Sequence, residues 1–295
     1  MGWGESFIAV DWGTTNRRAW RIGPGGAVEE EMEDGLGILS VPAGEFLKTV
    51  SEITGRLGDH PLLLAGMIGS NRGWVEAPYV PCPAGLPELA GGLKWVEPGR
   101  IAIVPGVSYE AGDEADVMRG EEAQILGAYA EGLLPPDAVI CHPGTHNKWI
   151  RLEDGRITAF RTVMTGELFN LLKGHSILAD LLKQKASADE AFDVGVRRGL
   201  ESEDLTAELF SVRARVLLGK ARSEDAASFT SGLLIGSDIR FGLRFAGEAE
   251  VVAIGRPDLT ALFARALGAA GRQVRELDGE QAFLAGARHI AELIR

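Results

Sequence analysis

Two short stretches of this chain repeat a pattern of small, hydroxyl-bearing and basic residues that suits phosphate binding. Residues 11–17 read DWGTTNR and follow an apolar run at 7–10, and residues 142–148 read HPGTHNK and follow an apolar run at 138–141. A glycine followed by hydroxyl residues at a tight turn between strands lets backbone N–H groups and short side chains approach phosphate oxygens. Two such turns predict a bound polyphosphate that is contacted from both sides.

In the first stretch, Asp11 ends a run that is expected to form a strand, and Gly13, Thr14 and Thr15 form the phosphate turn. A carboxylate in this place can hold Mg²⁺ through water, because Mg²⁺ keeps much of its hydration. The alternative is that Asp11 only caps the turn through its own backbone. The presence of a second copy of the pattern favours the magnesium role.

The second stretch supplies the opposite wall, formed by Gly144, Thr145, His146 and Lys148. Hydrogen-bond donors in this turn suit the β- and γ-phosphates, where charge shifts during transfer. Because His142 stands where the first stretch has an aspartate, this turn is not expected to hold the metal in the same manner. The alternative is an ordinary hairpin with a surface lysine and a structural His146.

Two neighbouring glutamates, Glu121 and Glu122, follow Gly120 shortly before the second stretch. The glycine brings the chain into a helix, and the positive end of that helix keeps carboxylates in its first turn ionised. Such a carboxylate can orient a substrate hydroxyl and accept its proton, a contribution of about 10²–10⁴-fold in typical cases. Glutamate pairs are also favoured in any first helical turn, so the spacing alone leaves this role open.

Residues 66–81 read as a loop at a strand end, with side chains that could bind a small acid. Arg72 is a candidate for a two-pronged contact with a substrate carboxylate, and Trp74 is a candidate for covering a small polar ligand. Asn16 and Arg18, beside the first turn, are further candidates for substrate binding. A solvated arginine and a packing tryptophan would explain the same residues.

A third signal for a nucleotide lies near the end of the chain. Residues 251–255 read VVAIG, and the next helix is expected to begin at Pro257. Gly255 would permit adenosine to approach the backbone closely. A strand followed by glycine and a helix occurs in most α/β proteins, so this pattern is weak by itself.

Composition limits the classes of function. At 295 residues, with 45% apolar and 24% charged residues, the chain is long enough for two globular domains. The net charge of −12 argues against nucleic acid or an anionic membrane as a partner. No apolar run approaches the roughly 20 residues that cross a bilayer. A strand from residue 7 leaves no room for a signal peptide, and two distant cysteines suit a reduced cytoplasmic setting.

Two similar successions of elements are expected to position these residues. The first comprises a three-stranded meander over 7–31, a helix over 45–58, strands at 62–65 and 101–104, and functional loops over 66–98. The second comprises a helix over 121–134, a meander over 138–163, helices over about 165–246, strands at 251–254 and 273–277, and a helix over 280–294. Gly232 and Gly236 would allow close packing between helices.

Taken together, these segments resemble the 2-dehydro-3-deoxygalactonokinase family of the actin-like ATPase superfamily. The matching segments are VDWGTTN (10–16), AGMIGS (65–70), GWVEAPY (73–79), VPGVS (104–108), DVMRGEE (116–122), PGTHNKW (143–149), LFSVRA (209–214) and SGLLIG (231–236). They run in family order over nearly the whole chain, and MRGEE and PGTH are far more specific than a glycine–threonine turn. The resemblance implies an α/β, two-domain actin-like (ribonuclease H-like) fold, with a duplicated mixed sheet flanked by helices.

The resemblance also implies an activity. It is the ATP- and Mg²⁺-dependent phosphorylation of the terminal hydroxyl of 2-dehydro-3-deoxy-D-galactonate, which gives the 6-phosphate in galactonate breakdown. Sugar kinases of the superfamily carry an acidic base just before the second phosphate turn, and Glu121 falls there, with Glu122 as a substrate contact. Many members have two glycines after the adenosine strand, whereas this chain has Gly255 followed by Arg256.

The resulting domain prediction has three parts. Residues 1–112 form an N-terminal actin-like domain with the sugar-acid loops, residues 113–279 form a C-terminal actin-like domain with the nucleotide site, and residues 280–295 form a helix that packs back on the first domain. The predicted partners are a small sugar acid and ATP, with a homodimer as the assembly to test. The predicted kinase closes over both ligands and excludes water.

Other functions remain open at this point. One is a phosphohydrolase of the same fold, although the acidic balance and the lack of a basic channel count against it. Another is a kinase for a different keto-deoxy sugar acid, because no single residue specifies the epimer. A sugar-sensing regulator should carry an added DNA-binding segment, and a filament-forming relative of actin is tested by light scattering with ATP.

Overall fold

The computed structural model describes residues 3–294 and divides into two compact units. Unit 1 comprises Met1–Asp137, Leu152–Ala159 and Gly279–Arg295, and unit 2 comprises Ala138–Arg151 and Phe160–Asp278. The predicted limit at residue 112 follows the sequence repeat, and the limit at residue 279 follows the expected C-terminal helix. Both stay predictions. Among residues 3–294, no helix is both long and apolar enough to cross a bilayer.

Unit 1 is built on a six-stranded sheet whose order is β3-β2-β1-β4-β7-β6. The strands are β1 (Phe7–Trp12), β2 (Arg17–Ile22), β3 (Val28–Asp34), β4 (Leu62–Gly66), β6 (Lys94–Glu97) and β7 (Ile101–Ile103). β1 pairs antiparallel with β2 and parallel with β4. The helix α1 (Phe46–Leu57) adds Val50 and Ile53 to a core that also contains Val10 and Trp12. The predicted meander and first helix are therefore confirmed.

The stretch 66–98 contains more regular structure than a set of loops. It holds the short helix α2 (Leu86–Gly91) together with β5 (Tyr79–Pro81) and β6. β5 joins β8 (Gly106–Ala111) and β9 (Glu114–Met118) in a three-stranded sheet of order β5-β8-β9. The prediction of loops alone was wrong here. These elements are partly exposed and too short to show a period of apolar residues in the sequence.

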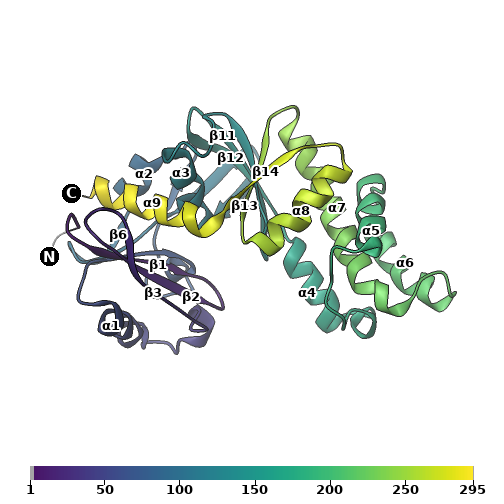
Figure 1. Ribbon diagram of the computed structural model, residues 1–295, viewed down its shortest axis with the longest axis horizontal. Helices are drawn as coiled ribbons and strands as arrows, with labels where there is room; N and C mark the ends of the chain where they lie inside the picture. The colour runs from purple at the N-terminus through teal and green to yellow at the C-terminus, as the bar shows by residue number, and fades with distance from the viewer. Residues whose placement is uncertain (1–2, 295) are drawn as a thin grey trace. The chain divides into compact units, whose positions relative to one another are not determined.

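Two helices of unit 1 pack at backbone distance. They are α3 (Glu121–Ala130) and α9 (Gly279–Leu293), which lie side by side in Figure 1. A Cβ atom added to Gly127 would lie 2.2 Å from the backbone nitrogen of Gly286. Phe283 of α9 also packs against Trp20 of β2, with ring centroids 5.5 Å apart. The C-terminal helix thus joins the start of α3 to the first meander.

Unit 2 contains most of a five-stranded sheet of order β12-β11-β10-β13-β14, whose residues Leu152–Ala159 are assigned to unit 1. The strands are β10 (Ala138–His142), β11 (Asn147–Glu153), β12 (Arg156–Val163), β13 (Val251–Gly255) and β14 (Val274–Asp278). The helices are α4 (Thr165–His175), α5 (Glu190–Glu201), α6 (Leu205–Leu217), α7 (Ala226–Ala246) and α8 (Pro257–Ala269). The second meander and the start of α8 at Pro257 are confirmed.

The helices α5, α6 and α7 are grouped together in Figure 1, and α5 and α7 pack through glycines. A Cβ atom added to Gly232 would lie 2.1 Å from the carbonyl oxygen of Phe192, and one added to Gly236 would lie 2.3 Å from that of Val196. The predicted close packing at these two glycines is confirmed. This packing holds α7 in place. Asp238 of α7 accepts hydrogen bonds from Asn147 and Trp149, which follow the second phosphate turn.

Candidate active site

The first phosphate turn lies between β1 and β2 and is held by a neighbouring segment. The Gly13 N–H donates to the Asn16 carbonyl over 2.9 Å, and Gly37 donates to the Thr15 carbonyl over 3.1 Å. A Cβ atom on Gly37 would lie 2.4 Å from the Thr14 carbonyl oxygen, so only glycine allows this approach. Thr14 and Thr15 are exposed, and within residues 3–294 their N–H groups have no backbone acceptor. The turn therefore presents donors, as a phosphate site requires.

Asp11 lies at the end of β1, beside β2 and β4. Its Oδ2 accepts a hydrogen bond from Arg18 Nη2 over 2.8 Å, and Arg18 Nη1 donates to Glu280 Oε2 over 3.0 Å. Burial lowers the pKa of Arg18, but the charge and hydrogen bond of Asp11, followed by Glu280, outweigh burial and raise it. Arg18 therefore stays charged and ties α9 to the first turn.

The Oδ1 atom of Asp11 has no hydrogen-bond partner in the described chain, and the side chain is 21% exposed. Residues 3–294 contain no group of three or more His, Cys, Asp or Glu side chains that could hold a metal. A single carboxylate suits Mg²⁺ nevertheless, because Mg²⁺ is usually bound by one or two carboxylates together with waters and substrate phosphates. Asp11 thus has the chemistry of a magnesium ligand.

A contact between two glycines places the start of α3 against the end of β4. Gly66 has a φ of +88°, and a Cβ there would lie 2.8 Å from the Trp12 carbonyl oxygen and 3.5 Å from Asp11 Oδ1. Gly120 has a φ of +112°, and a Cβ there would lie 3.3 Å from the Gly66 Cα. Glycine relieves both the backbone strain and the crowding. Unit 1 therefore brings Asp11 and the helix start at Glu121 into one small region.

The two glutamates of this helix start have different surroundings. Glu122 is fully buried, and its two carboxyl oxygens accept the Gly120 N–H over 2.8 and 2.7 Å. Burial, reinforced by the charge of Glu121, raises the pKa of Glu122 to about 8. Glu121 is only partly buried, and its Oε2 accepts the Arg119 N–H over 3.1 Å. A buried, protonated carboxyl is a poor proton acceptor, so the geometry favours Glu121 as the base.

Sequence reasoning did not single out Arg119, which is 8% exposed. Its Nη2 donates to the Ala77 carbonyl over 2.8 Å, and its guanidinium lies 4.4 Å from the centroid of the Tyr79 ring. Its Nε and Nη1 have no hydrogen-bond partner among residues 3–294. Arg119 thus connects the segment after β4 to the start of α3. The only signal was a basic residue directly before Gly120.

The two residues predicted in the substrate loop, Arg72 and Trp74, have different surroundings. Arg72 is exposed, and its side chain has no hydrogen bond or ion pair within residues 3–294. Trp74 is partly buried and packs against the core of unit 1. This packing supports the alternative interpretation of the tryptophan. The substrate roles of Asn16, Arg18, Arg72, Trp74 and Glu122 stay predictions.

The second phosphate turn lies in unit 2, between β10 and β11. The Thr145 carbonyl accepts the Glu167 N–H over 2.9 Å, and His146 Nε2 lies 2.5 Å from Glu167 Oε2. Thr145 and His146 are exposed, whereas Lys148 is only 5% exposed. The alternative with a surface lysine is therefore wrong. Glu167, at the start of α4, is a contact that the sequence did not reveal.

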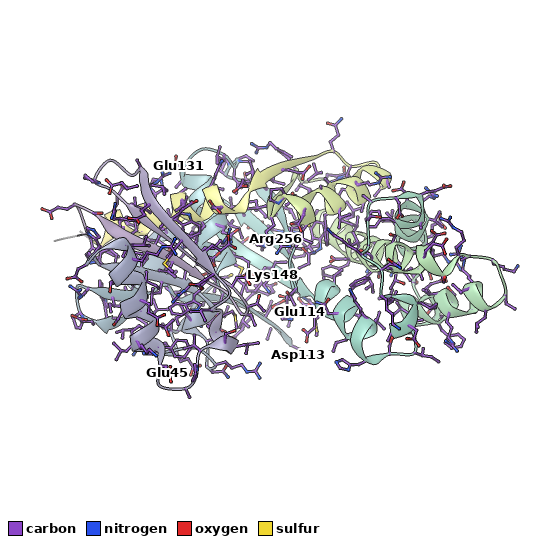
Figure 2. The ribbon with its side chains drawn as sticks, turned by 60° about the horizontal axis from the view of Figure 1, so that its bottom comes forward. Glu45, Asp113, Glu114, Glu131, Lys148 and Arg256 are labelled. Atoms are coloured by element: carbon purple, nitrogen blue, oxygen red, sulfur yellow. The ribbon has the colours of Figure 1, made fainter. Side chains whose placement is uncertain are left out.

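The end of β13 lies beside the second turn. β10 and β13 pair in parallel, and a Cβ on Gly255 would lie 3.5 Å from the Pro143 carbonyl oxygen. Ligands of α/β sheets bind at the carboxyl ends of parallel strands, which suits the predicted adenosine contact. Arg256 is exposed and forms an ion pair with Asp258 over 2.8 Å. Figure 2 labels Arg256 and Lys148, both of unit 2.

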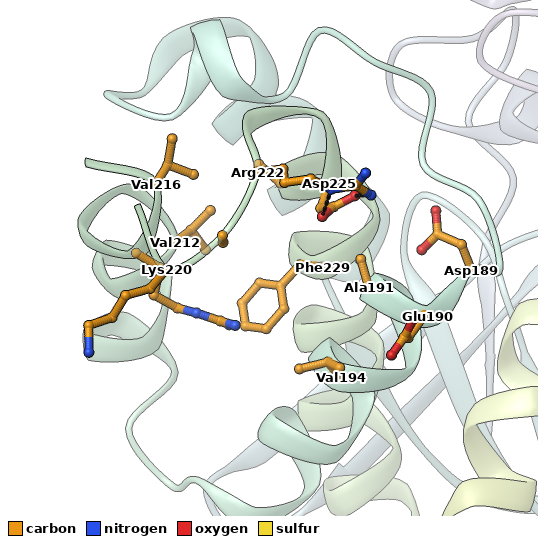
Figure 3. A pocket seen from close by; sticks show the side chains of 13 residues that line it. Asp189, Glu190, Ala191, Val194, Val212, Val216, Lys220, Arg222, Asp225 and Phe229 are labelled. Carbon is orange, nitrogen blue, oxygen red and sulfur yellow. Dashed lines mark hydrogen bonds and ion pairs between the residues drawn. The ribbon is translucent and has the colours of Figure 1, made fainter. Parts of the chain in front are cut away.

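Unit 2 also contains a cavity of about 570 Å³ among α5, α6 and the start of α7. Figure 3 shows its side chains, which include Phe229, Val194 and the Arg222–Asp225 ion pair. None of the predicted site residues lines this cavity. It is separate from the phosphate turn of the same unit.

Comparisons with known proteins agree on one family. The sequence model of the 2-keto-3-deoxy-galactonokinase family matches residues 11–290. The 2-dehydro-3-deoxygalactonokinase of Escherichia coli is 37% identical over 291 residues, which cover 98% of each chain. A crystal structure from Sinorhizobium meliloti with the same enzyme name has a TM-score of 0.91 and 37% identity, covering 98% of this chain and 99% of the other.

A more distant structure bears on the fold alone. Component A of the (R)-2-hydroxyglutaryl-CoA dehydratase of Acidaminococcus fermentans has a TM-score of 0.55 at 13% identity, and covers 99% of this chain and 100% of its own. The predicted two-domain actin-like fold is thereby confirmed. With the family model and a full-length relative in agreement, the chain belongs to the 2-keto-3-deoxy-galactonokinase family.

Proposed function

We propose that this protein transfers the γ-phosphoryl group of ATP to the terminal hydroxyl of 2-dehydro-3-deoxy-D-galactonate, giving the 6-phosphate and ADP. Membership of the family implies an ATP-dependent phosphotransferase that acts on a sugar acid. The observation that carries the proposal is the Gly66–Gly120 contact, which gathers Asp11 and Glu121 in unit 1. A metal-binding carboxylate and a proton acceptor close together are what a kinase needs at its reacting centre.

In the reaction, the terminal hydroxyl oxygen of the sugar acid forms a bond to the γ-phosphorus as the bond to the bridging oxygen of ADP breaks. Glu121 accepts the hydroxyl proton. Because the phosphoryl transition state is loose, Glu121 contributes mainly by orienting the hydroxyl. Glu122 holds the helix start through its contacts with Gly120.

In each unit, the donors of the phosphate turn suit the negative charge of phosphate. In unit 1 these are the N–H groups and hydroxyls of Thr14 and Thr15, on the turn that Gly13 closes by donating its own N–H to the Asn16 carbonyl. In unit 2 the proposed nucleotide contacts are the hydrogen-bond donors of Gly144, Thr145, His146 and Lys148, together with the backbone at Gly255. Preorganised donors of this kind stabilise the charge that develops during transfer. The local donors are essential because the whole protein carries a net charge of −12.

Magnesium is part of the proposal, and Asp11 is the residue that would hold it. When bound, Mg²⁺ supplies positive charge to the phosphate oxygens. Arg18 shares the Asp11 carboxylate, which orients it and leaves Oδ1 for the hydrated ion. The exposed Arg72 is the proposed partner of the substrate carboxylate, with Asn16 and Trp74 as further contacts. We place the reaction in the cytoplasm, where ATP is supplied.

A coupled ADP-release assay tests the proposal. The panel comprises the keto-deoxy acids derived from galactonate and gluconate, together with simple sugars that lack a carboxylate. We expect turnover with the galactonate-derived acid in the presence of Mg²⁺ and ATP, and product phosphorylated at the terminal oxygen. Release of phosphate from ATP without any sugar phosphate would instead indicate a phosphohydrolase. Preference for the gluconate-derived acid would reject the galactonate-derived acid as the substrate but keep the kinase activity. The predicted homodimer is tested separately by light scattering.

A further inference from the structure

A buried carboxylate lies beneath the second phosphate turn. Asp238, in α7, is 2% exposed. Its two oxygens each accept a hydrogen bond from Asn147 Nδ2 over 2.9 Å, Oδ1 accepts one from Trp149 Nε1 over 2.7 Å, and Oδ2 accepts one from Thr165 Oγ1 over 2.5 Å. Three side chains from two other elements thus converge on one carboxylate.

These donors lie on both sides of the turn. Asn147 and Trp149 belong to β11, which leaves the turn, and Thr165 begins α4. The next residues of α4 contact the turn itself: a Cβ on Gly166 would lie 2.6 Å from the Gly144 carbonyl oxygen, and the Glu167 N–H donates to Thr145. One carboxylate therefore fixes both the strand and the helix that hold residues 143–146 in shape.

We propose that Asp238 is a positioning residue for the phosphoryl donor, which acts by holding the second phosphate turn between β11 and α4. The proposal rests on the proposed function only in taking ATP as the ligand of this turn. Asp238 itself touches no phosphate. Its effect reaches the ligand through Asn147, Thr165 and the backbone of residues 143–146.

The chemistry requires an ionised carboxylate in this place. An ionised carboxylate only accepts hydrogen bonds and has room for all three donors. An asparagine would turn an NH₂ group toward at least one of them, which leaves buried donors facing each other. Burial, which exceeds the opposing effect of the three hydrogen bonds, raises the pKa of Asp238 to about 6. Protonation below that pH removes an acceptor in the same way as the amide does.

A thiol and three arginines lie near this carboxylate, and His146 and Glu167 lie at the turn that it holds. On β10, the Cys141 thiol is buried, and burial followed by the charge of Asp238 raises its pKa well above the usual range. A cavity of about 310 Å³ beside Asp238 is lined by Arg161 of β12 and by Arg240 and Arg244 of α7. The raised pKa keeps the Cys141 thiol neutral between pH 5 and 8, and the variants below leave the arginines, His146 and Glu167 in place. A change in ATP binding near pH 6 that depends on residue 238 therefore reports on Asp238.

The experiment measures the affinity for a non-hydrolysable ATP analogue by calorimetry, and KM and kcat by the coupled assay, between pH 5 and 8. For wild-type protein we expect affinity to fall as the pH drops through about 6. Asp238→Asn should weaken binding about tenfold at pH 7.5, since a displaced turn costs heavily, and should remove the part of the pH dependence that comes from residue 238. KM for the sugar acid should change less than twofold. Asp193→Asn is the matched control and should behave like wild type, because Asp193 is a half-buried residue of α5 whose partner is Arg265 of α8.

Thr165→Val is the second test variant and replaces Asp238→Asn if that protein fails to fold. It removes one hydrogen-bond donor to Asp238 and keeps the shape of the side chain. With one fewer hydrogen bond to the ionised form, the pKa of Asp238 should rise. The pH at which the affinity for the ATP analogue begins to fall should then be higher, and the affinity at pH 7.5 should be about threefold weaker.

Either of two results would overturn the positioning role. One is an unchanged affinity and pH profile in both variants. The other is an equal loss for ATP analogue and sugar acid that follows thermal instability. An inactive wild type that still binds the analogue would reject the kinase and leave this test valid.

Discussion

At the scale of single residues, burial divides the work between two adjacent glutamates. Glu122 is enclosed and keeps its proton near neutral pH, whereas the partly buried Glu121 has access to a ligand. The two carboxyls also bond to neighbouring backbone groups, Glu121 to the Arg119 N–H and Glu122 to the Gly120 N–H. One glutamate therefore suits proton transfer and the other suits anchoring the helix start.

Glu121→Gln tests this division. Because the amide cannot accept the hydroxyl proton but retains the shape of the side chain, kcat should fall by about 10²–10⁴-fold. KM for the sugar acid should change only a few fold. Steady-state kinetics of Glu121→Gln and Glu122→Gln, measured side by side, give the answer. A larger loss of kcat in Glu122→Gln than in Glu121→Gln would exchange the two roles.

Glu122→Gln makes a separate prediction about stability. The pKa of Glu122 is raised from 4.5 in the unfolded chain to about 8 in the fold, so its contribution is fully present below pH 4.5 and is lost as the pH rises toward 8. The glutamine variant carries no such ionisation. Its free energy of unfolding, from urea titration, should exceed that of wild type by up to about 5 kcal/mol at pH 9 but not at pH 4.5, because each pH unit between these two pKa values is worth about 1.4 kcal/mol. Parallel pH curves for the two proteins would show that Glu122 does not hold its proton.

Asp11→Asn tests the proposed magnesium ligand. The amide is a much weaker ligand for Mg²⁺, so turnover should fall by at least about 10²-fold while the melting temperature stays near that of wild type. Asp59→Asn is the control, since Asp59 is an exposed partner of Arg100. Magnesium titrations of kcat should separate the two variants. Near-normal turnover in Asp11→Asn would remove this residue from the site.

The amino-acid sequence alone could indicate Asp11, the two turns and the glutamate pair, because each of these patterns is local. They could not indicate Arg119 or Asp238, whose partners are distant in sequence. The Ala77 carbonyl is a backbone atom without any signature, and Asp238 meets Asn147 only after α7 has packed on the sheet. The sequence left open whether Lys148 is a wall residue or a surface lysine, and the structure buries it because it lies in the strand that follows the turn.

At the scale of elements, periodicity decided what could be predicted. The helix α1 repeats apolar residues at helical spacing and was predicted within one residue at each end. The strands β5, β6, β8 and β9 are half-exposed, and α2 is only six residues long, so none of them shows a clear period. The glycines of α7 were informative because a missing side chain matters only where two backbones meet.

Gly236→Ala tests that packing. The added methyl would lie 2.3 Å from the Val196 carbonyl oxygen, a backbone atom that cannot rotate away. Overpacking of this kind typically costs about 1–3 kcal/mol, which should appear as a lower melting temperature. Gly174→Ala in α4 is the matched control, because a Cβ there meets nothing within 4 Å. An equal melting temperature for Gly236→Ala and Gly174→Ala would mean that α5 and α7 are not in backbone contact.

At the scale of the whole molecule, the repeat explains how one short pattern serves twice. Each unit presents a glycine–threonine turn at the end of its first strand, but only unit 1 has a carboxylate before it. Unit 2 has His142 in that position and an anchoring carboxylate, Asp238, on a helix below. On the proposed function, the duplicated fold supplies one turn with the proposed metal ligand Asp11 and a second turn with hydrogen-bond donors alone.

Metal removal should therefore be visible in the stability of the entire chain. A ligand that binds only the folded state raises the free energy of unfolding by about 2.7 kcal/mol at a hundred times its dissociation constant. The non-hydrolysable ATP analogue should raise the melting temperature with Mg²⁺ and by much less with a chelator, because Asp11 then faces the phosphates without the ion between them. In Asp11→Asn the chelator should make little difference, since the amide carries no charge to repel phosphate. A shift in wild type that is the same with Mg²⁺ and with the chelator would show that nucleotide binding does not use the metal.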